Sequence, residues 1–135
     1  MIKLFTLKGA NEMLSTVDAR LQDLQDALAE LREARSSLEK VAPLTTESMA
    51  ANQELAFLIR NVHTARREVQ KLGVQVPDLD AGIVEFPARL GGEIVHLVWQ
   101  RGQGAITEYH RLTGDEARRP IESHDDTGAK RPLST

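Results

Sequence analysis

Four residues in the second half of the chain have side chains suited to metal binding or proton transfer, namely Glu85, His96, Glu108 and His110. Imidazole nitrogens and carboxylate oxygens bind divalent metals, and a carboxylate beside an imidazole can share a proton in acid–base catalysis. Because cross-strand neighbours in a sheet lie about 5 Å apart, these side chains would meet if their strands were adjacent. They follow no compact motif such as His-Glu-x-x-His, so the competing interpretation is an ordinary solvated sheet face. We therefore treat the four as candidate ligands of a divalent metal, predict no other cofactor, and assign no catalytic residue.

The segments that must position these residues alternate between apolar and polar side chains with the period of two that is typical of strands. They lie at residues 83–86, 94–99 and 105–110, which predicts a small three-stranded antiparallel β-meander over about 83–110. Gly91-Gly92 is suited to a two-residue hairpin turn. The pairs that this turn predicts are Leu90 with Glu93, Phe86 with Leu97 and Val84 with Trp99. The next turn, residues 100–104, is longer and leaves the face of Glu108 and His110 undetermined.

Before the sheet, apolar residues recur at spacings of three and four along two long segments, as they do in helices that pair through a narrow seam. The first helix is expected at about 7–41, with Thr6 as its N-cap, and the second at about 46–72, ended by Gly73. Pro43 interrupts the chain between them. The sequence thus predicts an α+β fold in which a long antiparallel coiled-coil helical hairpin precedes the sheet. Residues 1–121 are expected to form a single domain, and residues 122–135 a flexible tail.

Three large apolar residues of the second helix, Met49, Phe57 and Ile59, fall outside the seam. They are candidates either for covering the sheet or for binding a partner. A seam of two residues in seven gives a thin core for two isolated helices, which favours a homodimer in which two hairpins form a four-helix bundle.

Composition excludes several classes of function. The chain has 17 basic and 20 acidic residues, a net charge of −3 with the signs interleaved, so nucleic-acid binding is not expected. It has no cysteine, which excludes disulfides and thiolate chemistry. No apolar run approaches the roughly 20 residues of a membrane span, and the first residues do not resemble a signal peptide. We therefore expect a cytoplasmic protein without a membrane partner.

Several short motifs resemble a bacterial family, the domain-of-unknown-function family 2203. They are the segments 82–87 (GIVEFP), 97–103 (LVWQRGQ), 109–110 (YH) and 119–121 (RPI), together with 5–6 (FT) and 10–11 (AN) near the start. The family favours Asp, Cys, Glu, Trp and Glu where this chain has Glu85, Val98, Gln103, Tyr109 and Gly9. This chain therefore lacks the family's thiol and one carboxylate but retains His110. The resemblance implies a fold and no mechanism.

Two functions from different classes follow. The preferred one is a non-enzymatic dimeric interaction or scaffold module, and the alternative is a small metal-dependent or acid–base enzyme whose site lies on the sheet. They differ in an observable way: an enzyme or metal protein should gather most of the four candidates into one cluster in a concavity. An interaction module should instead show an exposed apolar patch and scattered polar side chains.

Overall fold

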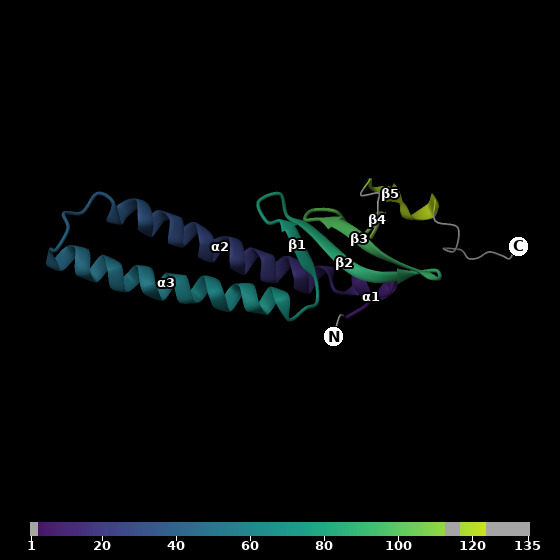
Figure 1. Ribbon diagram of the computed structural model, residues 1–135, viewed down its shortest axis with the longest axis horizontal. Coiled ribbons are helices and arrows are strands. Elements are labelled where there is room, and N and C mark those ends of the chain that lie inside the picture. The colour runs from purple at the N-terminus through teal and green to yellow at the C-terminus, as the bar shows by residue number, and fades with distance from the viewer. Residues whose placement is uncertain (1–2, 113–116, 124–135) are drawn as a thin grey trace, which may run out of the picture. The chain divides into compact units, whose positions relative to one another are not determined.

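The computed structural model describes residues 3–112 and 117–123 (Figure 1). Residues 19–71 form one compact unit, and the described residues before and after them form another. The first is helical and the second contains a five-stranded antiparallel sheet, so the prediction of an α+β fold is confirmed.

The helical unit is a hairpin of two long antiparallel helices, α2 (Leu14–Leu38) and α3 (Thr46–Gln70), shown side by side in Figure 1. Both helices bury apolar residues at the predicted spacing of three and four, among them Leu21, Leu24, Leu31, Leu58 and Val62. Thr45 begins α3 through a capping box with Ser48, whose backbone N–H donates to the Thr45 hydroxyl at 3.0 Å. Gly73 has a φ of 84°, the left-handed conformation that favours glycine after a helix.

The prediction of one continuous first helix over 7–41 is wrong. A short helix, α1 (Leu7–Glu12), is separated from α2 at Met13, and α2 ends at Leu38. The backbone N–H of Met13 donates to the Ala10 carbonyl, three residues back, at 3.0 Å. This tighter bond closes α1 in place of the α-helical bond to the fourth residue back. Thr6 caps α1 as predicted, accepting from the Gly9 N–H at 2.9 Å.

The sheet has five strands where three were predicted. They are β1 (Gln75–Asp78), β2 (Ile83–Leu90), β3 (Glu93–Gln100), β4 (Glu108–Arg111) and β5 (Arg119–Pro120), which lie in that order. Both unpredicted strands are short, contain proline and lie at the edges, where a residue without an N–H is tolerated. A single 3-10 turn at Ile121–Ser123 follows. The remainder of the predicted flexible tail, residues 124–135, lies outside the described residues.

Gly91 and Gly92 form the predicted two-residue turn between β2 and β3. The strands pair Leu90 with Glu93, Phe86 with Leu97 and Val84 with Trp99, as expected from the sequence. One face of the sheet therefore carries the buried apolar residues of β2 and β3, and Tyr109 of β4 joins them; the ion pair of Glu93 with Arg111 lies at the end of this face. Phe86 is completely buried there and meets Phe5 edge-on, with ring centroids 5.2 Å apart. This packing leaves the opposite face for Glu85 and His96.

Two separate segments hold the outer edge of β2. At its beginning β1 pairs with it, Gln75 opposite Glu85 and Asp78 opposite Ile83. Further along, Phe5 bridges to Ala88: its N–H donates to the Pro87 carbonyl at 2.8 Å and its carbonyl accepts from Arg89 at 3.0 Å. The strand that carries Glu85 is thus hydrogen-bonded on both sides. Among the described helices none is long and apolar enough to cross a membrane.

Candidate metal centre

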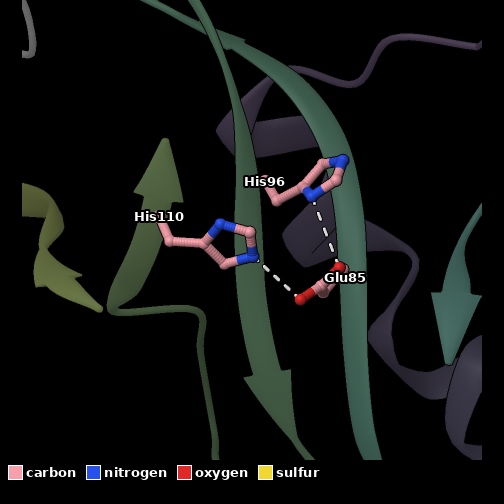
Figure 2. A group of neighbouring side chains, drawn as sticks. All are labelled: Glu85, His96 and His110. Atoms are coloured by element: carbon pink, nitrogen blue, oxygen red, sulfur yellow. Dashed lines mark hydrogen bonds and ion pairs between the residues drawn. The ribbon is translucent and has the colours of Figure 1, made fainter. Parts of the chain in front are cut away.

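The pairing of β3 with β4 decides where His110 lies. His96 is directly opposite His110, and Leu97 is opposite Tyr109. Since Leu97 and Tyr109 belong to the buried face, both histidines and Glu85 share the other face. Glu85 and His110 come from the two strands on either side of β3 and reach toward each other over it (Figure 2).

Glu85 contacts both imidazole rings, each with a different oxygen. Its Oε2 is 2.8 Å from His110 Nε2, and its Oε1 is 3.3 Å from His96 Nδ1 (Figure 2). The rings are 5.1 Å apart between centroids and nearly perpendicular. All three side chains are largely buried, with exposed fractions of 17% for Glu85, 19% for His96 and 13% for His110. Their donor atoms lie within 4.8 Å of one another.

The hydrogen bonds of His110 determine which of its nitrogens is available. Its Nδ1 lies 3.0 Å from the Arg111 carbonyl oxygen, which only accepts hydrogen bonds, so Nδ1 carries a proton. Nε2 therefore faces Glu85 either with a second proton on the ring or with a proton on the carboxyl group. In either form one proton lies between Nε2 and Oε2. A metal ion at this place would replace that proton, while Nδ1–H would continue to orient the ring, as it does in most metal-binding histidines.

Both ring nitrogens of His110 have a partner, whereas one ring nitrogen of His96 lacks a hydrogen bond. Within the described residues, its buried Nδ1 has no hydrogen-bond partner, although it lies within ion-pairing distance of Glu85 Oε1. Burial lowers the pKa of His96 below the usual 6.5; the charge of Glu85 opposes this shift and His110 adds to it. The ring is therefore neutral at pH 7. A neutral imidazole with an unpartnered nitrogen is the form that binds metal.

These three side chains form a set of two imidazoles and one carboxylate. Such a set binds zinc and other first-row transition metals, and it differs from the all-oxygen ligands that magnesium and calcium prefer. Around tetrahedral zinc, with bonds of about 2.0–2.1 Å, ligand atoms lie about 3.3 Å from one another. Glu85 lies 2.8 and 3.3 Å from the two rings through its two different oxygens, and the three donor atoms lie within 4.8 Å of one another, so they would have to move closer together to bind one ion.

Beside the cluster is a cavity of about 480 Å³ whose lining includes Glu85, His96 and His110. Asp78 of β1 and Arg118, immediately before β5, also line it. The sequence did not place either residue beside the cluster, because β1 and β5 were not predicted. No sequence signal could have placed Arg118 there, since it adjoins a strand of only two residues.

The structure separates the fourth candidate from the other three. Glu108 shares their face of the sheet, but its Oε1 lies 3.8 Å from Arg118 Nη1 and it is not part of the cluster. The three residues considered for partner binding lie on α3, in the helical unit. Met49 and Phe57 are exposed by 63% and 54%, and Ile59 is half-buried.

The fold and the site together define a small α+β protein with a histidine–carboxylate cluster on one face of an antiparallel sheet. Residues 3–121 match the family described as "Uncharacterized conserved protein (DUF2203)", and the chain belongs to that family. The family suspected from the sequence motifs is thereby confirmed. No curated protein matches the chain, and no solved structure matches it.

Proposed function

We propose that this protein binds a divalent transition-metal ion, of which Zn²⁺ is the probe of choice, through Glu85, His96 and His110. The observation that carries the proposal is the buried Nδ1 of His96, which has no hydrogen-bond partner among the described residues and lies 3.3 Å from a carboxylate already in contact with a second imidazole. A buried polar atom without a partner is costly, and a metal ion would satisfy it. The alternative is a purely structural cluster in which Glu85 joins three strands.

The proposed ion would have fewer ligands from the described protein residues than its coordination requires. Structural zinc sites have four protein ligands, whereas catalytic ones have three and leave a position for water or substrate. Here three donors converge, and the same three residues line a cavity. The arrangement therefore supports the metal-dependent alternative over the scaffold module that the sequence favoured.

The proposal is tested by titrating the metal-free protein with Zn²⁺ in a calorimeter at pH 7, in two buffers with different ionisation enthalpies. We expect one zinc per chain and the release of about one proton, because the ion replaces the proton between His110 and Glu85. Zinc at about 100 times its Kd should also raise Tm by at least roughly 5 °C. Absence of a saturable heat, together with an unchanged Tm, would leave only the structural alternative.

A second candidate function, self-association, is favoured by the exposure of Met49 and Phe57. The two residues are eight apart on α3 and so lie on about the same side of the helix. We propose that this side meets a second copy of the chain, because the hairpin's own buried stripe is narrow.

Light scattering after size exclusion should then give twice the chain mass of 15.0 kDa for the wild type and a single chain for Phe57→Glu. His63→Glu, at an exposed position of the same helix, introduces the same charge and should remain dimeric. A wild type of 15.0 kDa at micromolar concentration would rule out the dimer.

A further inference from the structure

The cavity beside the three candidate ligands is lined by charged residues and by apolar residues. Its charged residues besides Glu85 are Asp78 and Arg118, and its apolar residues are Pro77, Ile83 and Leu112. Its volume, about 480 Å³, falls within the range of small-molecule sites. Because Glu85, His96 and His110 also line it, the free coordination positions of an ion at the cluster would face this space.

We propose that the cavity binds a small aliphatic carboxylate, whose carboxyl group completes the coordination of the metal ion and is attracted by Arg118. This inference rests on the proposed metal site and names the class of ligand that the site takes.

The sign of the ligand's charge follows from the charged groups of the lining. Without metal, Glu85 and His110 share one proton and together carry no net charge, so within the lining the carboxylate of Asp78 and the guanidinium of Arg118 balance each other. A bound divalent ion that displaces this proton makes the lining positive, because its two charges and that of Arg118 exceed those of Glu85 and Asp78; the carboxylate of Glu108, 3.8 Å from Arg118, lies outside the lining. The metal-loaded cavity therefore attracts an anion.

Arg118 is able to take part in this attraction. Its guanidinium forms an ion pair with Glu108 at 3.8 Å, which is too long for a hydrogen bond, and its side chain is 42% exposed, so its N–H donors remain accessible to a ligand. Arginine binds carboxylates through parallel N–H donors, which makes it well suited to the oxygen atoms of such a ligand.

The body of the ligand is inferred from the apolar part of the lining. Ile83, Pro77 and Leu112 offer no hydrogen-bonding side chain, and Leu112 is 48% exposed. A short hydrocarbon chain in contact with these residues would be partly removed from water, because the cavity is open on one side, and each CH₂ group that is fully buried favours binding by about 0.8 kcal/mol, or roughly fourfold in Kd. Inorganic anions gain nothing from these residues.

The experiment uses the full chain loaded with Co²⁺, whose visible absorption bands report on the ligands of the ion. Acetate, propionate and butyrate are titrated in turn, with inorganic phosphate as the competing anion. We expect the bands to shift, with Kd values on the order of millimolar that fall about three- to fourfold for each carbon added. Phosphate should bind more weakly than butyrate.

Two variants test the role of Arg118. Arg118→Gln should weaken butyrate binding about tenfold and leave the affinity for Co²⁺ unchanged. Arg89→Gln removes an exposed arginine from the same face of β2, outside the cavity, and should bind butyrate as the wild type does.

The two proposals fail in different ways. Absence of Co²⁺ bands in the wild type would overturn the metal site itself. Bands that appear but do not respond to carboxylates, or that respond more strongly to phosphate than to butyrate, would overturn the ligand assignment alone. Loss of Co²⁺ binding in Arg118→Gln would also overturn it, since Arg118 would then support the ion and not the anion.

Discussion

His110→Gln should reduce the affinity for Zn²⁺ at least about 100-fold, since changes even to groups that only orient a metal ligand cost 10- to 100-fold. The substitution removes the Nε2 donor that lies 2.8 Å from Glu85, and with it the ring that the Arg111 carbonyl holds in place. Glu85→Gln and His96→Gln should have effects of similar size, because the ligands come from three different strands and act together. Calorimetric titration of each variant measures these losses.

The matched control is His63→Gln, which removes an exposed histidine from α3 in the helical unit. It should bind zinc with wild-type affinity. Circular dichroism and melting in the presence of a chelator show whether each variant is folded, because His110→Gln leaves a buried carboxylate oxygen without its partner at a cost of about 1–3 kcal/mol. Glu85→Gln preserves the shape of the side chain and serves as the second test if His110→Gln does not fold. If both variants bound zinc with wild-type affinity, zinc would not bind at this face of the sheet, and the proposed site would be wrong.

Phe86→Ala should lower the free energy of unfolding by about 3–5 kcal/mol, the loss typical of removing a buried phenylalanine ring. Phe86 is completely buried, packs edge-on against Phe5 and lies opposite Leu97 in the pairing of β2 with β3. Alanine leaves a cavity and also removes the ring contact with Phe5, whose backbone remains hydrogen-bonded to β2. Urea denaturation followed by circular dichroism gives the difference.

For comparison, Ile94→Ala shortens an apolar residue of β3 that is 40% exposed and should cost less than about 1 kcal/mol. Phe86 lies on the face opposite the metal ligands, so the folded fraction of Phe86→Ala should retain its zinc affinity. A loss below 1 kcal/mol in Phe86→Ala would mean that this face of the sheet is not the core of its unit.

The predictable part of the fold is the part encoded by local patterns. Gly91-Gly92 determines the register of β2 and β3 by itself, so the positions of Glu85 and His96 on one face followed from the sequence. The face of His110 did not, because the irregular connection from β3 to β4 sets its register. The break at Met13 was missed because the apolar spacing continues through it. Pro77 concealed β1, since proline is excluded from central strands but tolerated at an edge.

The same reasons explain how much of the site was predictable. Residue chemistry was sufficient to nominate four candidates, and the structure brings three of them together. Glu108 differs from the other three because it pairs with Arg118. Arg118 lies at the end of the connection from β4 to β5, whose sequence has no pattern from which this pairing could be predicted. Whether Nδ1 of His96 finds a hydrogen-bond partner among the described residues depends on the side-chain torsion angles of that histidine, which no sequence pattern encodes.

The bridge between Phe5 and Ala88 joins segments that are synthesised at different times, which limits when the sheet can form during translation. The sheet unit contains segments from before and after the helical hairpin, so the hairpin is complete before any strand of the sheet has emerged. Asp18 and Arg101, which pair at 2.7 Å, are 83 residues apart, and closing such long loops is slow. Phe5 therefore cannot pair with β2 or contact Phe86 until β2 has been synthesised. His110, carried by β4, reaches Glu85 later still, so the cluster can form only after β4 has been synthesised.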